Sequence, residues 1–231
     1  MKKIGVLGGM SWESTLQYYR LLNEGTRDRL GGLHSARVVI SSVDFARVEK
    51  MQNAGEWHAA GELLAKEAVA LEGAGAELIL IATNTMHKVY EQISDAVSCD
   101  VLHLADVTAR AVRESGLNRI GLLATRYTME DDFYRGRLTA NTVESLVPEL
   151  ADRTELQRII YEELCLGVVT PTSHDRLIDI SRRMIQRGAQ GIVLGCTELE
   201  LSVSDDELLV PVFATTLLHC RAALDLALAG C

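Results

Sequence analysis

Two strand-like segments end in residues that can transfer protons. Residues 192–198 (IVLGCTE) place Cys196 directly after an apolar run, and residues 79–85 (ILIATNT) place Thr83 at the corresponding point. At a strand end that starts a helix, backbone N–H groups and the helix dipole lower a thiol's pKa from about 8.5. We therefore expect Cys196 to act as a thiolate, either as a nucleophile or as a general base. A threonine hydroxyl does not titrate near neutral pH, so Thr83 can only hold a water or pass on a proton.

The composition favours a small-molecule partner over a macromolecular one. The chain has 231 residues, a formal charge of -9 and 48% hydrophobic residues, enough core for one large or two small domains. Its lysines and arginines are scattered, which argues against nucleic acid and against an anionic membrane surface. No apolar run is long enough to span a bilayer, and the N-terminus leads directly into a strand-like segment. We therefore expect a cytoplasmic location.

The cysteines and histidines do not form a metal or disulfide pattern. The five cysteines are widely spaced and lack a CxxC motif, so we expect reduced thiols, no zinc and no other metal. Apart from Cys196, we expect Cys99, Cys165 and Cys220 to be core or surface residues, and we assign no role to Cys231. A nucleophilic cysteine would need a histidine partner, and the candidates are His87, His103 and His174.

Strand-like and helix-like segments alternate along the chain, which predicts an α/β fold with parallel sheets. Ser11 is the expected N-cap of the first helix, and residues 44–55 are expected to form a loop. The expected strands are residues 4–7, 36–43, 78–82, 101–104, 118–124, 142–147, 191–195 and 209–213.

The second half of the sequence repeats the first. The stretch IGVL at residues 4–7 matches IGLL at residues 120–123, and GAELIL at residues 75–80 matches GAQGIV at residues 188–193. The two spacings are 116 and 113 residues, and the second spacing also relates Thr83 to Cys196. We expect two similar α/β domains, residues 1–105 with 209–231 and residues 106–208, with these two residues at equivalent strand ends.

Four further residues could contact a ligand at the carboxyl ends of the strands. Gly8 and Gly9 allow a close backbone approach before a helix N-terminus, which suits a carboxylate or a phosphate. An ordinary turn between a strand and a helix would look the same, and the motif is not a dinucleotide fingerprint. Arg47 and Gln52 follow the second strand, where open α/β sheets bind ligands.

Three motifs together resemble the cofactor-independent aspartate/glutamate racemase family. They are TNTMH at residues 83–87, GCTE at residues 195–198 and GVLGGM at residues 5–10. The resemblance implies an isomerase with two flavodoxin-like domains related by a pseudo-twofold axis, an active site in the cleft between them, and frequent homodimers. It also implies production of D-amino acids by two bases, without pyridoxal phosphate, metal or any other cofactor.

The resemblance assigns roles to individual residues. Most members have cysteine at both catalytic positions, whereas Thr83 places this chain with a threonine/cysteine subgroup, in which Cys196 handles the proton of the L-enantiomer. Glu198 is expected to lie beside Cys196 without contacting the substrate itself, or else to be a solvated carboxylate at a helix start. The residues expected to bind the substrate are Gly9, Met10, Arg47, Gln52, Asn84, Thr85, Thr125, Thr128 and Thr197.

The expected substrate is an acidic amino acid of the aspartate/glutamate type. Relatives that act on aspartate commonly hold the distal carboxylate with two basic residues. Arg47 keeps the first, and residues 164–167 (LCLG) lack the second, a lysine. A single arginine can still bind a carboxylate through two hydrogen bonds.

Two other functions fit the same motifs. One is a related enzyme such as a hydantoin racemase, a maleate isomerase or an arylmalonate decarboxylase, since decarboxylation needs only one proton delivery. The other is a non-catalytic module that binds an amino acid. Carbon dioxide release from a malonate would identify the decarboxylase, and ligand stabilisation without turnover would identify the binding module.

Overall fold

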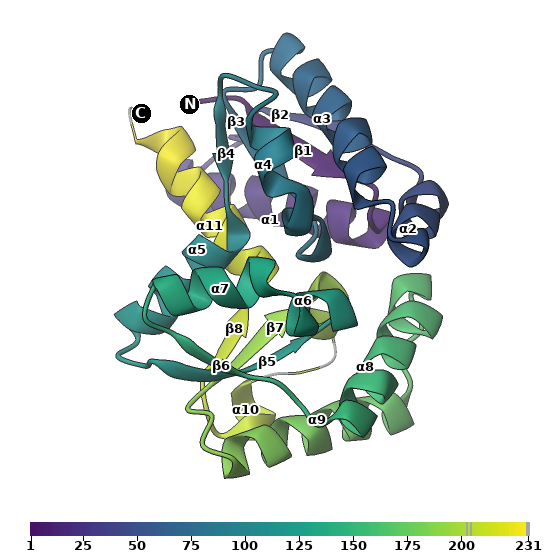
Figure 1. Ribbon diagram of the computed structural model, residues 1–231. Coiled ribbons are helices and arrows are strands. Elements are labelled where there is room, and N and C mark those ends of the chain that lie inside the picture. Colours follow the sequence, from purple (N-terminus) through teal and green to yellow (C-terminus); the bar gives the residue numbers. More distant parts are fainter. Residues whose placement is uncertain (202, 204, 230–231) are drawn as a thin grey trace. The chain divides into compact units, whose positions relative to one another are not determined.

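The computed structural model in Figure 1 describes residues 1–201, 203 and 205–229, so Cys231 lies outside the described residues. The chain divides into two compact units, one comprising Met1–Leu104 with His219–Cys231 and the other Ala105–Leu218. Each unit contains a four-stranded parallel sheet with helices around it. The predicted α/β class with two flavodoxin-like domains is confirmed. No described helix is long and apolar enough to cross a membrane.

The first unit has the strand order β2-β1-β3-β4. Its elements in chain order are β1 (Ile4–Gly8), α1 (Trp12–Leu30), β2 (Val38–Ser42), α2 (Phe45–Ala54), α3 (Trp57–Gly73), β3 (Leu78–Ile81), the 3-10 helix η1 (Thr85–Val89), α4 (Tyr90–Ser94) and β4 (Asp100–Leu102). The helix α5 (Leu104–Glu114) then leads into the second unit.

The second unit has the equivalent order β6-β5-β7-β8. Its elements are β5 (Arg119–Ala124), α6 (Arg126–Glu130), α7 (Asp132–Ala140), β6 (Glu144–Leu146), α8 (Leu150–Glu162), η2 (Leu164–Leu166), α9 (Pro171–Gln186), β7 (Ile192–Gly195), η3 (Thr197–Leu201), α10 (Asp205–Leu208) and β8 (Val212–Ala214). The final helix α11 (Thr215–Leu228) begins in the second unit and ends in the first.

The repeat seen in the sequence extends to register and packing. Ile4 pairs with Leu78 in the first sheet, and Leu123 pairs with Leu194 in the second, as the two sequence spacings require. The first strand of each sheet also carries a glycine with little free space. A Cβ on Gly5 would meet Ile79 and Leu71, and a Cβ on Gly121 would meet the residues 113 positions later, which are Ile192 and Met184.

Strand alternation gives the first sheet two apolar faces. Ile4, Val6, Leu78 and Leu80 pack with α1 and the end of α11, whereas Ile79 and its neighbours pack with α3 (Figure 1). Both faces of a parallel sheet are covered in this way because its strands are joined by helices. The carboxyl edge is thereby left as the place where polar residues gather.

Two features differ from the sequence prediction. Residues 44–55 are not a loop, because Asp44 caps the helix α2 through its side chain and Gly55 closes it in the left-handed conformation. The second boundary between the units lies at Leu218/His219, whereas residues 209–231 were expected in the first domain. The reason is that β8 pairs with β7, so residues 212–214 belong to the second sheet.

Candidate functional site

Strand β3 delivers Thr83 to the carboxyl edge of the first sheet. Leu7 pairs with Ile81, and the Ala82 N–H donates to the Leu7 carbonyl oxygen at 2.9 Å. Thr83 follows directly and is partly buried. Thr83 therefore stands immediately after the hydrogen bond that joins Ala82 to Leu7 at the end of this strand.

The polar residues after Thr83 are packed inside the first unit. Asn84 and Thr85 are both buried, and Thr85 begins η1. The turn is tightened by a hydrogen bond from the His87 N–H to the Asn84 carbonyl oxygen at 3.1 Å. The structure thus brings three of the predicted site residues, Thr83, Asn84 and Thr85, onto one short turn.

Helix α2 places one of its two predicted residues against this turn. Gln52 is 3% exposed, and its Nε2 donates to the Met86 sulfur at 3.1 Å. Arg47 lies on the same helix and is exposed. Gln52 is therefore joined to the Thr83 turn, while Arg47 lies on the surface.

The glycine turn after β1 is explained by packing within its own unit. Gly9 has a φ of 84°, and a Cβ there would clash with the backbone of Val43. The Gly9 N–H donates to the Thr15 hydroxyl at 2.7 Å, and the same hydroxyl donates to the Ser11 carbonyl at 2.9 Å. Ser11 caps α1, as predicted. The Met10 side chain belongs to the hydrophobic core.

The second sheet presents an equivalent edge. Ala124 pairs with Gly195, so Thr125 and Cys196 directly follow neighbouring strand ends. Thr125 caps α6 by accepting from the Thr128 N–H at 3.4 Å, and the two hydroxyl groups lie 3.2 Å apart. Both threonines are buried. The structure therefore brings Thr125 and Thr128 together at the edge that carries Cys196.

Cys196 and Glu198 form a buried hydrogen-bonded pair. The Cys196 thiol is 8% exposed and donates to Glu198 Oε2 over 2.9 Å. Glu198 is 4% exposed, so it is not a solvated carboxylate at a helix start. Thr197, between the two, is also buried. A proton can pass along this short contact from sulfur to carboxylate.

The electrostatic setting of Cys196 is opposite to the one predicted. Burial raises the pKa of the Cys196 thiol well above its usual value, and the negative charge of Glu198 raises it further. The element that follows is η3, a 3-10 helix of five residues with acidic residues in its first turn. The expectation of a lowered pKa was wrong for this structure because desolvation and a neighbouring carboxylate outweigh any helix dipole.

A second thiol contacts the same carboxylate. Cys165, on η2, is partly buried and donates to Glu198 Oε1 over 3.7 Å. Cys165 was expected only to be a core or surface residue, and its separation of 33 residues from Glu198 offers no local pattern that would have revealed the contact. Glu198 is thus held between two thiols.

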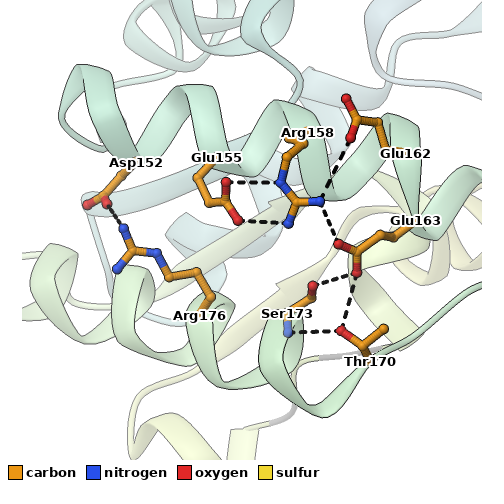
Figure 2. A network of polar contacts seen from close by, with 8 residues as sticks. All are labelled: Asp152, Glu155, Arg158, Glu162, Glu163, Thr170, Ser173 and Arg176. Atoms are coloured by element: carbon orange, nitrogen blue, oxygen red, sulfur yellow. Dashed lines mark hydrogen bonds and ion pairs between the residues drawn. The ribbon is translucent and has the colours of Figure 1, made fainter.

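A polar network fixes the chain on either side of η2 (Figure 2). Glu163 accepts from Arg158 at 2.7 Å with one carboxylate oxygen, and from the hydroxyl groups of Ser173 and Thr170 with the other. These contacts, led by the Ser173 hydrogen bond, lower the pKa of Glu163. The network joins α8 and α9 at the point where the chain turns toward Cys165, so it holds that residue in place.

The described residues contain no group of three or more histidine, cysteine, aspartate or glutamate side chains placed to hold a metal ion. The chemistry that the arrangement offers is proton transfer. The second unit contains a buried thiol and carboxylate in contact at one strand end. The first unit contains a threonine hydroxyl group at its own equivalent strand end. Both are accompanied by buried polar residues able to bind a small polar molecule.

Comparisons with known proteins agree with the motif resemblance. The family model described as Asp/Glu/Hydantoin racemase matches residues 7–223. A crystal structure of a candidate Asp/Glu racemase from Yersinia pestis is 49% identical, with 99% of this chain and 100% of that chain covered and a TM-score of 0.92.

Two archaeal structures extend the comparison. An aspartate racemase homologue from Pyrococcus horikoshii OT3 is 34% identical, covering 98% of this chain and 99% of that chain with a TM-score of 0.86. The aspartate racemase of Picrophilus torridus is 19% identical, covering 98% and 94% with a TM-score of 0.81, a likeness of fold alone.

Proposed function

The chain belongs to the Asp/Glu/Hydantoin racemase family and is an isomerase, and we propose that it racemises aspartate- or glutamate-type amino acids without pyridoxal phosphate. Cys196 is the main base, and Thr83 relays a proton on the opposite face of the α-carbon. The observation that carries the proposal is the buried hydrogen bond between the Cys196 thiol and Glu198.

The raised pKa of Cys196 requires a local proton acceptor, and Glu198 supplies it. In the proposed step, the thiol proton moves to Glu198 Oε2 and the resulting thiolate takes the α-proton of the L-acid. The planar carbanion then receives a proton on its other face from the Thr83 hydroxyl or from a water held there. Solvent restores the proton to that face and removes the one from Glu198, so protons balance over a turnover.

The polar residues around the two turns are proposed to bind the amino-acid backbone of the substrate. Asn84, Thr85 and Thr197 are buried beside the catalytic positions, and Thr125 and Thr128 lie at the neighbouring strand end. The backbone groups of Gly9 and Met10 complete this set in the proposal, because the side chain of Met10 is already packed in the core.

Recognition of the substrate side chain is assigned to α2. Arg47 is exposed there and can hold a distal carboxylate through two hydrogen bonds, while Gln52 supports the Thr83 turn through Met86. Residues 164–167 contribute a thiol where a lysine would have added a second positive charge. We therefore expect acidic substrates without strict preference for aspartate. The cytoplasmic location and the homodimer remain predictions, and light scattering measures the second.

Proton exchange in deuterium oxide tests the reaction directly. Exchange on the same face needs Cys196 and Glu198 but not Thr83, whereas inversion also needs the Thr83 face, where a hydroxyl group is a weak acid. We expect L-glutamate or L-aspartate to take up deuterium at the α-carbon faster than the D-enantiomer appears, as followed by NMR and chiral chromatography. Equal rates of uptake and inversion would contradict the unequal roles of the two residues.

Further measurements separate the alternatives. A decarboxylase would release carbon dioxide from a malonate and exchange no amino-acid proton. A binding module would be stabilised by an amino acid and keep its function after thiol alkylation. Enantiomers have equal free energy, so any true racemase must also reach a 1:1 mixture of L- and D-acid at equilibrium, whichever face reacts faster.

A further inference from the structure

His87 joins the Thr83 turn to the start of the next helix. Its Nδ1 lies 2.8 Å from the Thr83 carbonyl oxygen, and its Nε2 lies 3.2 Å from the backbone nitrogen of Leu104, the first residue of α5. The side chain is 2% exposed. Every atom of this connection lies in the first unit.

The two contacts define the protonation of the ring. The Leu104 N–H is a donor, so Nε2 must accept, and the Thr83 carbonyl is an acceptor, so Nδ1 must carry the proton. His87 is therefore a neutral imidazole in a single tautomer. The amide of Leu104 selects the form of the ring that can donate to Thr83.

The rings around His87 reinforce this arrangement. His103 lies 4.6 Å away and His219 lies 6.0 Å away, measured between ring centroids. His219 is itself held at both nitrogens, by the Tyr18 hydroxyl at 2.8 Å and by the Leu102 carbonyl at 3.0 Å. Burial lowers the pKa of His219 to about 3, so this neighbour adds no positive charge near neutral pH.

The second unit repeats the connection at the equivalent position. Glu200 stands 113 residues after His87, the spacing that relates Thr83 to Cys196. Its Oε1 accepts from the Thr216 N–H at 2.7 Å, in the first turn of α11. In the first unit, a side chain from η1, which follows β3, binds the amino end of α5 after β4. In the second unit, a side chain from η3, which follows β7, binds the amino end of α11 after β8.

We propose that His87 is a positioning residue that holds the Thr83 hydroxyl in place by clamping the Thr83 carbonyl. The inference rests on the proposed role of Thr83 as the proton relay. It goes beyond that role because it assigns a distinct task to a residue that touches no reacting atom. Because Cys196 is carried by the other unit's sheet, loss of the clamp affects one face of the reaction and spares the other.

Three substitutions at one position separate the two hydrogen bonds. Asparagine places its amide nitrogen where Nδ1 stands and can still donate to Thr83. Glutamine reaches the Nε2 position and can still accept from Leu104, and leucine keeps neither bond. We expect His87→Gln and His87→Leu to lower inversion of L-glutamate by about 10- to 100-fold while deuterium uptake at the α-carbon stays near the wild-type rate. His87→Asn should retain most of the inversion.

Amide hydrogen exchange of the peptide containing residues 82–87 provides a readout that does not depend on activity. It should rise in His87→Gln and His87→Leu and stay low in His87→Asn. Tyr18→Phe is the matched control, because it removes a buried hydrogen bond from the same ring cluster without touching Thr83, and it should leave the ratio of inversion to uptake unchanged.

Each outcome has a separate meaning. An unchanged ratio and unchanged amide exchange in His87→Gln would overturn the inference, as would an equal fall of inversion and uptake in all three variants, which indicates general loss of structure. Absence of deuterium uptake in the wild-type protein would refute the proposed function instead. In that case the amide-exchange pattern still decides whether His87 clamps the turn.

Discussion

At the scale of single residues, Glu198 acts on the Cys196 thiol in two opposing ways. Its negative charge raises the thiol's pKa, which disfavours the thiolate. Its Oε2, at 2.9 Å, is also the nearest place for the thiol proton to go. If the second effect governs the reaction, the carboxylate is required even though it makes the resting thiol less acidic.

Glu198→Gln separates these effects, because glutamine keeps the shape and removes the charge. We expect the pKa of Cys196 to fall, since the neighbouring negative charge is gone, and α-proton exchange to drop by about 10²- to 10⁴-fold through loss of the proton acceptor. The pH dependence of Cys196 alkylation, followed by peptide mass spectrometry, measures the first change. Faster exchange in the variant would show that Glu198 acts only as an unfavourable charge.

Thr83→Cys tests the opposite face of the reaction. A thiol at position 83 can ionise, whereas the native hydroxyl cannot near neutral pH. We expect faster turnover of D-glutamate and a smaller gap between proton exchange and inversion of the L-acid. Thr83→Ser is the control, because it keeps a hydroxyl group and should leave the gap in place. An unchanged D-side rate in the cysteine variant would argue against the relay role.

The sequence allowed the proposed reactive residues to be paired, but it did not reveal their environment. Cys196 and Thr83 could be paired because both follow apolar strands at one repeat spacing, which is local information. The raised pKa of Cys196 depends on desolvation by the whole unit, and the contact between Cys165 and Glu198 joins distant segments. Neither quantity has a sequence signature, so both required the fold.

At the scale of elements, capping side chains determine where the helices around the site begin. Ser11, Asp44 and Thr125 each accept a backbone N–H at the start of α1, α2 and α6. The first cap was predicted from the sequence. The second was missed even though Asp44 and Gly55 bracket the helix, which is only ten residues long and buries just Val48 and Gln52.

The amino end of α11 should make stability depend on pH through Glu200. Burial raises the pKa of this carboxyl group to about 7. Because the folded pKa lies above the unfolded one, the folded state holds the proton more tightly, and its contribution to stability is lost as the pH rises from about 4.5 to about 7. The loss is at most about 3 kcal/mol.

Glu200→Gln is expected to flatten the curve of stability against pH in this range, because glutamine does not titrate and can still accept from the Thr216 N–H. Urea unfolding at a series of pH values measures the difference between the variant and the wild-type protein. A parallel dependence on pH in the two proteins would show that Glu200 titrates near its unfolded value.

At the scale of the whole molecule, the two units share one strand order and one register, and they differ at the equivalent strand end, which is followed by Thr83 in the first unit and by Cys196 in the second. The strand orders, the registers and the glycines packed beneath Ile79 and Ile192 correspond in the two units, so the duplication inferred from two short motifs was a sound guide to the fold. The boundary at Leu218/His219 was harder to predict, because a single helix, α11, serves both units and no break in the sequence marks the transition.

The position of Glu198 between two thiols has a practical consequence for chemical labelling. Cys165 is the more accessible of the two sulfurs, so a soft electrophile will reach it and disturb the shared carboxylate before Cys196 is modified. Inactivation by such a reagent will therefore result first from modification of Cys165, which has no proposed role in proton transfer. A Cys165→Ser background removes that route and leaves Cys196 as the one described thiol that contacts Glu198.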